Sequence, residues 1–489
     1  MRAHRALTIA LVAALPLVGL AAPVSAAPPR ASSIAWAPCE DATLSGFQCG
    51  TLEVPRDWDD SSKGVFELAV VRHRSTGTSA QRIGSLFFNP GGPGGSGLAV
   101  MPLVWSELPS TTKQRFDLVS WDPRGVGATL PSVECDLPEW PLPAAVGPVD
   151  WDAIAASIRD QVRDANEQCV TDHSDIAPYL GTNNVVRDLD ALRAAVGDSK
   201  LNYWGASYGT RIGYAYALTY PDRMRAIILD GPVNPRGSIE DFALGYSTAA
   251  DPALGILFEL YPQTRAQYRR VMASLETAPL RLSATRNFTR WDVGLGLEAS
   301  APSQSGLPQL AQWLGKIDKA ISGTAVEKRK AKEYLRRLPQ MPAYAMAGVP
   351  AIINCLDYAD RPDAARLDVM GTRIRFDAPI TGWVRAVQIP PACEGLEELT
   401  PDPVPLVQGN DWSARMLILA ATRDSQTPYR WATSMANAFR SSPLVSYVGN
   451  QHVTYTAAGS PCVDGAATTY LVSLKLPGVD VACPLAARP

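Results

Sequence analysis

The most informative segment of the sequence is Tyr203-Trp204-Gly205-Ala206-Ser207-Tyr208-Gly209-Thr210. It contains the pattern G-x-S-x-G centred on Ser207, with an apolar run before it and a helix-compatible run, residues 211–220, after it. Glycines on both sides of a serine permit a tight turn between a buried strand and a helix, because side chains at those positions would collide. Such a turn exposes the serine hydroxyl. The pattern is short and also fits an ordinary strand-to-helix turn, so its context in the chain must decide.

The composition is that of a folded globular protein. Of 489 residues, 46% are hydrophobic and 19% are charged, and the formal net charge is -3. No basic block offers the electrostatic footprint that phosphate binding needs. Only His73, His173 and His452 follow the first 26 residues, and the sequence has no C-x-x-C pair. We therefore expect no nucleic acid partner, no metal and no cofactor.

The first 26 residues have the pattern of a secretory signal peptide. Arg2 and Arg5 supply a positive start, residues 6–21 an apolar segment, and Val24-Ser25-Ala26 a small-residue cleavage site. An uncleaved membrane anchor is the alternative, but the apolar segment is shorter than the roughly 20 residues that a span requires. We expect a secreted monomer with no stable membrane insertion after cleavage.

All eight cysteines fall after this segment, and an even number in an exported chain indicates disulfide bonds. The metal-binding alternative is poor, because the histidines and cysteines lack the spacing of a metal site. Proximity along the chain suggests four sequential pairs: Cys39 with Cys49, Cys135 with Cys169, Cys355 with Cys393, and Cys462 with Cys483.

Strand-like apolar runs alternate with helical patterns over most of the chain, which predicts an α/β fold with a mostly parallel sheet covered by helices on both faces. One long segment, residues 235–405, instead has helical spacing with few strand-like runs, which predicts a mainly helical cap. We therefore expect a signal peptide at 1–26, the first part of the core at 27–234, the cap at 235–405 and the C-terminal part of the core at 406–489.

A glycine-rich loop follows the predicted strand at 83–88, with the sequence Asn89-Pro90-Gly91-Gly92-Pro93-Gly94-Gly95-Ser96-Gly97. So many glycines cannot support a regular element, and they let the backbone approach another group closely. A phosphate cradle is one interpretation, but the loop lacks the G-K-[ST] ending. We interpret the loop as part of an oxyanion hole, in which the backbone N-H of Gly92 or its neighbour acts together with that of Tyr208.

A serine nucleophile needs a base and an orienting carboxylate. On folds that carry such a serine turn, the triad runs in the order serine, acid, histidine, and His452 is the only histidine after Ser207. Asp424 and Asp230 are the two candidates for the acid, because each lies just past a predicted strand. Asp424 is favoured because it precedes His452 by one helix and one strand, as expected for neighbouring strand ends. Asp230 would then serve a turn.

Motifs spread over nearly all of the chain after the predicted signal peptide carry a resemblance to a known family. The chain resembles the secreted tripeptidyl aminopeptidases of actinobacteria, in the prolyl aminopeptidase branch (family S33) of the α/β-hydrolases. The resemblance implies an α/β-hydrolase fold, a triad of Ser207, Asp424 and His452, and removal of short peptides, often tripeptides, from free peptide or protein N-termini. The matching pieces are Asn89 to Gly95, Trp121 to Gly125, Gly205 to Thr210, Leu229 to Gly231, Ile352 to Asp357, Asp424 with Thr427-Pro428, His452, and Ser460 to Cys483.

The resemblance also implies acidic groups that hold the α-ammonium of the substrate, because an unpaired buried cation is costly. Asp357 is the candidate, and the alternative is that Asp357 braces the cap beside Cys355. A secreted carboxylesterase or amidase acting on a non-peptide substrate is a second hypothesis, because relatives on one fold diverge in function. A catalytically silent binding protein is the third, which the retained serine, aspartate and histidine disfavour.

Overall fold

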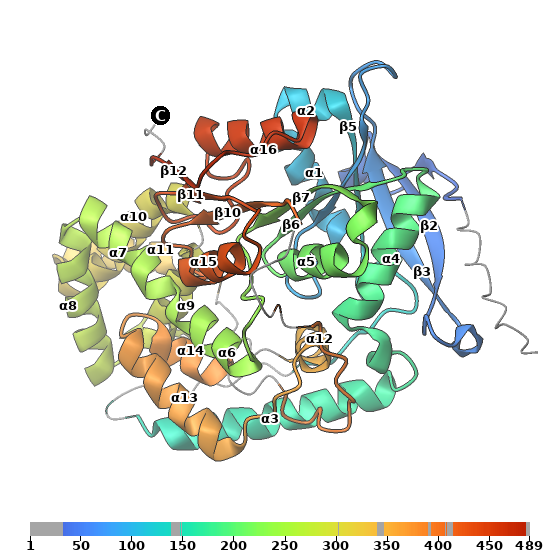
Figure 1. Cartoon of the computed structure of the whole chain (residues 1–489). Coiled ribbons are helices and arrows are strands. Elements are labelled where there is room, and N and C mark those ends of the chain that lie inside the picture. Colours follow the sequence, from blue (N-terminus) through green and yellow to red (C-terminus); the bar gives the residue numbers. More distant parts are fainter. Residues whose placement is uncertain are drawn as a thin grey trace, which may run out of the picture. The chain divides into compact units, whose positions relative to one another are not determined.

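The apolar runs of the sequence form one central sheet in the computed structural model, which describes residues 33–137, 147, 149–301, 303–339, 347–389, 393–405, 407 and 414–485. The predicted signal peptide lies outside these residues. Among them the sheet has ten strands, in the spatial order β1-β2-β3-β5-β4-β6-β7-β10-β11-β12 (Figure 1). The strands are β1 (Ala37–Pro38), β2 (Gln48–Pro55), β3 (Val65–His73), β4 (Gly84–Asn89), β5 (Phe116–Trp121), β6 (Leu201–Ala206), β7 (Met224–Asp230), β10 (Leu417–Ala421), β11 (Leu444–Tyr447) and β12 (Val481–Cys483).

The strands pair antiparallel at one edge of the sheet and parallel over the rest. β1 with β2, β2 with β3 and β3 with β5 are antiparallel. The described pairings from β5 through β4 to β12 are all parallel. Parallel neighbours require long crossovers, and helices supply them here. The predicted mostly parallel sheet is therefore confirmed.

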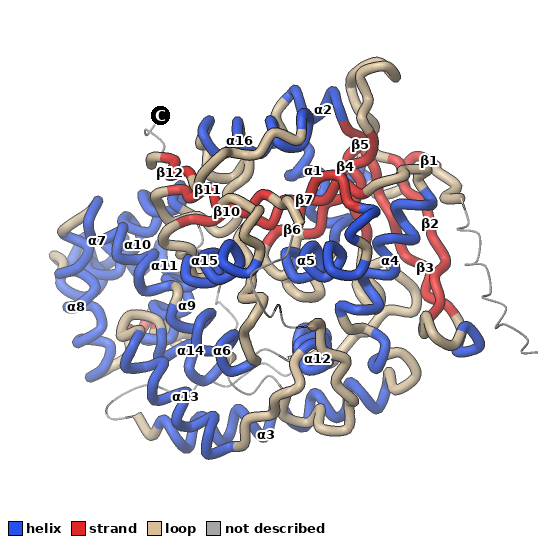
Figure 2. The backbone as a smooth tube through the Cα atoms, in the orientation of Figure 1, coloured by secondary structure: helices blue, strands red, loops and turns tan. Residues whose placement is uncertain are grey.

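Helices cover both faces of this sheet. Ile227 and Ile228, neighbours in β7, enter different hydrophobic clusters, because successive side chains of a strand point to opposite faces. Figure 2 shows the strands as a band with helices on both sides. On the Ile227 face lie α4 (Thr182–Ala195), α5 (Gly209–Thr219) and α15 (Tyr429–Ala438), and on the Ile228 face lie α1 (Gly97–Glu107) and α16 (Pro461–Ser473). The short helix α2 (Ser110–Arg115) packs beside α16 on the Ile228 face (Figure 1).

A helical insertion separates β7 from β10. Its helices α7 to α11 share a hydrophobic cluster of their own, whereas Ile352 and Leu356 of α12 pack into the core cluster on the Ile227 face. The helices are α6 (Ile239–Thr248), α7 (Ala250–Leu260), α8 (Gln263–Thr277), α9 (Arg290–Ser300), α10 (Leu307–Ser322), α11 (Ala325–Arg337), α12 (Val349–Asp357), α13 (Ala364–Asp377) and α14 (Gly382–Gln388), with a small hairpin of β8 (Leu280–Arg281) and β9 (Asn287–Phe288).

The long helix α3 (Trp151–Asp172) lies between β5 and β6 in the sequence but packs against the insertion. Ile158 and Val162 of α3 share a cluster with Trp291 of α9 and Trp383 of α14. Figure 1 shows α3 on the same side of the sheet as α12, α13 and α14. The insertion thus rests on a helix from the first half of the chain.

The four predicted disulfide pairings are confirmed: Cys39 with Cys49, Cys135 with Cys169, Cys355 with Cys393, and Cys462 with Cys483.

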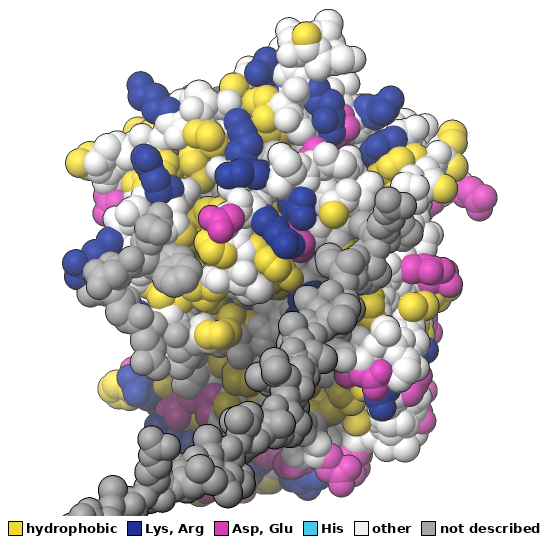
Figure 3. All heavy atoms as spheres, turned by 45° about the vertical axis from the view of Figure 1, so that its right-hand side comes forward, with side chains coloured by type: hydrophobic (Ala, Val, Ile, Leu, Met, Phe, Trp, Pro, Cys, Tyr) yellow, Lys and Arg dark blue, Asp and Glu magenta, His cyan; other side chains and the backbone are white. Residues whose placement is uncertain are grey.

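Within the described part of the chain, no helix has the length and apolar character needed to cross a membrane. On the face shown in Figure 3, basic side chains gather in the upper half and acidic side chains lie mainly along the right and lower edges.

Candidate active site

Ser207 stands in the turn between β6 and α5. Its φ is 56°, a left-handed conformation that is strained for a residue other than glycine and that clusters at functional sites. Glycine is required at position 205, because a Cβ there would lie 2.3 Å from the carbonyl oxygen of Gly209. The N-H of Ser207 donates to the carbonyl of Asp230 at 2.8 Å. The end of β7 therefore holds the turn in place.

The glycine-rich loop lies directly against this turn. A Cβ at Gly91 would lie 2.5 Å from the carbonyl oxygen of Ala206 and 2.8 Å from the backbone nitrogen of Tyr208, so a larger residue cannot fit. Tyr208 immediately precedes α5, and the N-terminal N-H groups of a helix have no carbonyl partner inside it and favour negative charge. Gly92 follows in the loop with a φ of 113°. The role of Gly92 and Tyr208 as oxyanion donors stays a prediction.

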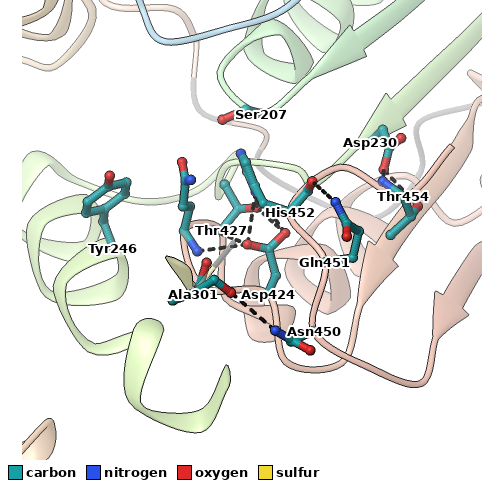
Figure 4. Close-up of polar contacts among 12 residues, drawn as sticks. Ser207, Asp230, Tyr246, Ala301, Asp424, Thr427, Asn450, Gln451, His452 and Thr454 are labelled. Atoms are coloured by element: carbon teal, nitrogen blue, oxygen red, sulfur yellow. Dashed lines mark hydrogen bonds and ion pairs between the residues drawn. The ribbon is translucent and has the colours of Figure 1, made fainter. Parts of the chain in front are cut away.

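Asp424 and His452 come from the loops that follow the neighbouring strands β10 and β11. Nδ1 of His452 lies 3.0 Å from each carboxylate oxygen of Asp424. An ionised carboxylate can only accept hydrogen bonds, so Nδ1 carries the proton and Nε2 is the basic nitrogen. Figure 4 shows the imidazole between the Asp424 carboxylate and the side chain of Ser207. The structure thus brings the three predicted triad residues together.

The Asp424 carboxylate is held by its own loop. The backbone N-H groups of Gln426 and Thr427 donate to Oδ1 at 2.8 and 2.9 Å, and the Thr427 hydroxyl donates to Oδ2 at 3.0 Å. The side chain of Asp424 has no exposed surface. These bonds fix the carboxylate in the orientation that faces the His452 ring, so the imidazole is held by a partner that cannot rotate freely.

Opposing effects act on the charge of His452. Burial is the largest single influence and lowers the pKa of His452, but the raising influences, led by the negative charge and hydrogen bond of Asp424, together outweigh it. Asp230 adds to the rise and Arg385 opposes it. The pKa of His452 is therefore raised above its ordinary value, which suits a group that takes a proton from a hydroxyl and then carries it as an imidazolium.

Asp230, the other candidate for the acid, binds backbone instead of the imidazole. Its Oδ1 accepts from the N-H and the hydroxyl of Thr454 at 2.8 and 2.9 Å, and its Oδ2 accepts from the N-H of Tyr455 at 2.8 Å. Burial raises the pKa of Asp230 to about 6, although these three donors lower it. The geometry thus favours Asp424 as the partner of His452.

Asp357, the predicted ammonium ligand, is enclosed at the C-terminal end of α12. The N-H and the hydroxyl of Thr182 donate to it at 2.9 and 2.7 Å, and the phenol of Tyr208 donates to it at 2.5 Å. Nη1 of Arg211 lies 3.9 Å away, and the Asp357 side chain has no exposed surface. Burial raises the pKa of Asp357, and Arg211 is the main opposing influence. These contacts favour the alternative role as a brace between the insertion and the core, and the ammonium role stays a prediction.

A buried arginine joins the insertion to the loop of Asp424. Arg385 on α14 donates to the carbonyl of Ser425 at 3.0 Å, to the carbonyl of Tyr246, and from Nε to Glu298 at 3.1 Å. Its side chain is 1% exposed. Sequence reasoning missed Arg385 because its partners lie 40 or more residues away and no local motif marks it.

The insertion also contacts the loop of His452. The side-chain amide of Asn450 donates to the carbonyl of Ala301 at 3.3 Å (Figure 4), and Ser303 forms an antiparallel bridge with Gln451. On the other side of the site, a Cβ at Gly94 would lie 3.2 Å from the side chain of Val349 at the start of α12. The segments that hold the three residues are therefore flanked by the insertion.

Known families match over much of the chain. Residues 84–289 match the family model described as alpha/beta hydrolase fold. Residues 380–483, which include Asp424 and His452, match the family model described as TAP-like protein. Together the two matches include all three residues of the site.

Three curated relatives are similar over nearly their whole length. Serine protease Hip1 of Mycobacterium tuberculosis is 30% identical, with 98% of this chain and 96% of that protein covered. Tripeptidyl aminopeptidase of Streptomyces lividans is 29% identical, with 96% and 90% covered. Carboxylesterase B of Mycobacterium tuberculosis is 28% identical, with 96% and 95% covered. Two of the three are thus named for cleavage of peptide bonds and one for cleavage of esters.

Proposed function

Because the chain belongs to the α/β-hydrolases of the tripeptidyl aminopeptidase type (family S33), we propose that it is a secreted serine exopeptidase that releases short peptides, tripeptides in particular, from free N-termini. That the chain is a serine hydrolase follows from the family itself. The observation that carries the finer proposal is the His452 imidazole, bonded to Asp424 and turned toward Ser207, in a chain similar throughout to a tripeptidyl aminopeptidase.

In the proposed acylation step, the Ser207 hydroxyl attacks the carbonyl carbon of the scissile peptide bond while Nε2 of His452 takes its proton. The negative charge that develops on the carbonyl oxygen is held by the N-H groups of Tyr208 and of Gly92 or its neighbour. Asp424 keeps the proton on Nδ1 and stabilises the imidazolium without becoming protonated. His452 then gives its proton to the leaving amine, which departs as the shortened peptide.

Deacylation repeats the same steps with water. Nε2 of His452 removes a proton from a water molecule, which attacks the acyl-enzyme carbonyl, and the proton returns to Oγ of Ser207 as the ester bond breaks. The acyl group released is the N-terminal fragment of the substrate, so its length reports how much chain the site admits.

The insertion supports cleavage near a chain end. It contacts the Asp424 loop through Arg385 and the His452 loop through Asn450, and Val349 lies close to the glycine-rich loop. Elements on several sides of a site restrict the path of a long polypeptide more than that of a free terminus. The four disulfides support export, because such bonds persist in oxidising compartments.

Matched peptide amides with free and acetylated N-termini test the exopeptidase proposal. We expect the free peptide to yield its N-terminal tripeptide, detected by mass spectrometry, and the acetylated peptide to be turned over at least about 100-fold more slowly, because the α-ammonium loses its charge. Equal cleavage of both would overturn the proposal.

The carboxylesterase relative favours a second candidate, an esterase acting on non-peptide substrates. Under this candidate a short acyl ester would be hydrolysed with a high kcat/KM while both peptides remained intact. The same two peptides and one ester therefore separate the two candidates.

A further inference from the structure

One buried carboxylate lies between the two halves of the active site and takes no part in the proton transfer described above. Asp230 ends β7, the strand between the one that leads to Ser207 and the one that leads to Asp424. Asp230 is fully buried, with 0% of its surface exposed to solvent. Its backbone carbonyl accepts the N-H of Ser207, and the N-H of the next residue, Gly231, donates to Leu419 in β10 at 2.9 Å. Residue 230 is therefore fixed by both neighbouring strands.

The Asp230 side chain reaches in another direction, to the backbone that follows His452. The N-H of Thr454, the hydroxyl of Thr454 and the N-H of Tyr455 all point at its two oxygens, at 2.8 to 2.9 Å. Figure 4 shows Asp230 beside Thr454 and apart from the His452 ring. A rigid strand end thus holds both the nucleophile turn and the backbone of the base.

The loop that carries His452 needs such a support. Val453 has a φ of 62° and Thr456 a φ of 68°, both in the left-handed region that residues with a side-chain Cβ rarely adopt. Such conformations persist only where surrounding bonds impose them. The bonds from Asp230 act on Thr454 and Tyr455, which lie between these two residues. They hold the bend at His452 and Val453 and the start of the turn that follows it.

We propose that Asp230 is a positioning residue that sets the placement of the His452 imidazole relative to Ser207, through its hydrogen bonds to the backbone of Thr454 and Tyr455. The inference rests on the proposed use of His452 as the base. Misplacement of reacting groups by about 1 Å can cost on the order of 100-fold in rate, so loss of the support should slow attack by Ser207 on any electrophile. The effect should appear in kcat, with little change in KM.

The insertion offers a matched control. Asp251 on α7 is also buried and accepts the same three kinds of bond, from the N-H of Ile380 at 2.7 Å, the N-H of Thr381 at 2.9 Å and the Thr381 hydroxyl at 2.7 Å. Burial raises the pKa of Asp251, as it does for Asp230. Asp251→Asn therefore disturbs a carboxylate of the same kind whose hydrogen bonds, within the described part of the chain, go to Ile380 and Thr381 and not to the loops of Ser207 or His452.

The test measures the rate at which a fluorophosphonate labels Ser207 in the full-length protein, together with kcat and KM. We expect Asp230→Asn to label about 10- to 100-fold more slowly than the unchanged protein, and Asp251→Asn to label at the unchanged rate with a similar shift in thermal midpoint. The low-field proton signal of His452 Nδ1-H should move in Asp230→Asn only. Unchanged labelling and an unmoved signal in Asp230→Asn, or equal slowing in both variants, would overturn the proposal.

A milder variant keeps the test decisive if Asp230→Asn does not fold. Thr454→Val removes the hydroxyl bond to Asp230 and leaves both backbone bonds, so labelling should slow by a few-fold to about tenfold. A Thr454→Val protein that labels at the unchanged rate would then reject the positioning role of Asp230.

Labelling by the fluorophosphonate does not depend on the natural substrate. Failure of the exopeptidase proposal would instead appear as absent peptide turnover in the unchanged protein that still reacts with the fluorophosphonate.

Discussion

At the scale of single residues, two aspartates hold different parts of the same histidine. Asp424 bonds to Nδ1 of the His452 ring, and Asp230 bonds to the backbone two and three residues later. Removing Ser207, Asp424 or Asp230 should therefore change different measurable quantities. Loss of Ser207 removes the nucleophile, loss of Asp424 removes the main partner that sets the protonation of the base, and loss of Asp230 changes the placement of the base and removes a smaller contribution to its raised pKa.

Ser207→Ala should abolish turnover and leave the fold intact, because only the hydroxyl is lost. We expect kcat to fall by at least about 1,000-fold, measured on a peptide amide, with an unchanged circular dichroism spectrum. The hydroxyl of the exposed Ser473 donates to the Thr469 carbonyl of its own helix α16, and the control Ser473→Ala should keep full turnover. Near-normal turnover in Ser207→Ala would contradict the assignment of the nucleophile.

The raised pKa of His452 sets the acid limit of activity. Only the neutral imidazole can accept a proton, so kcat/KM should fall as the pH drops through a value above the ordinary histidine pKa. In Asp424→Asn the charge that raises this pKa is gone, so the residual activity, lower by roughly 10,000-fold, should persist to lower pH. Profiles of kcat/KM from about pH 5 to pH 9 measure this, and identical acid limbs would contradict the role of Asp424.

The titration of His452 affects stability and activity in opposite directions: activity falls as the pH drops, whereas the contribution of His452 to stability falls as the pH rises. A group whose pKa is raised in the folded state favours folding when protonated. The stabilisation is therefore fully present below the ordinary histidine pKa and is lost as the pH rises through the raised value.

At the scale of elements, the site is built where helices of the insertion meet strand ends of the core. Arg385 joins α14 to the loop after β10, and Asp357 joins α12 to the starts of α4 and α5. Both contacts are buried and satisfied by named partners, so they resist separation of the insertion from the core. The packing of α12 into the core cluster acts in the same direction.

Arg385→Met should loosen the contact between α14 and the Asp424 loop. The carbonyls of Tyr246 and Ser425 would lose their donor, and Glu298 its partner, which should lower the free energy of unfolding by about 2 kcal/mol. Arg423→Met is the control, because its ion pair with Glu259 is exposed and should contribute less than about 1 kcal/mol. Urea unfolding of the two variants measures the difference, and equal losses would contradict the bridging role of Arg385.

The turn between β6 and α5 should tolerate no side chain at Gly205. A methyl group would collide with the Gly209 carbonyl at 2.3 Å, so Gly205→Ala should either fail to fold or lose more than about 3 kcal/mol and the reactivity of Ser207. Gly465→Ala in α16 is the control, because a Cβ there meets nothing within 4 Å, and it should stabilise the protein by up to about 1 kcal/mol. Thermal unfolding and fluorophosphonate labelling of both variants test this, and a reactive, stable Gly205→Ala would contradict the steric argument.

At the scale of the whole molecule, the features that were predictable from the sequence are those with a local signal. The alternation of apolar runs gave the mostly parallel sheet, and cysteine proximity gave the four disulfide pairs, both of which are confirmed. His452 could be singled out because no other histidine follows Ser207. The catalytic roles of Ser207, Asp424 and His452 stay a proposal, although the structure brings the three together.

What the sequence could not provide depends on contacts between distant segments. The packing of α3 against α9 and α14 joins residues more than 100 positions apart. The backbone carbonyl of Asp230 bonds to Ser207, and its carboxylate bonds to Thr454, which lies 224 residues away. The sequence could not decide between the two candidate roles of Asp357, because nothing local to α12 reveals Thr182, Tyr208 and Arg211 around it. Local patterns carry no information about such partners.

The mass of the acyl-enzyme identifies both the nucleophile and the length of the fragment that the site admits. A peptide with a free N-terminus is mixed with the protein, the reaction is quenched in acid during turnover, and the protein is digested and mapped by mass spectrometry. We expect an N-terminal tripeptide joined as an ester to Ser207, and its absence in Ser207→Ala. Turnover with an acyl group on another residue, or with no covalent intermediate at any time point, would contradict the proposed role of Ser207.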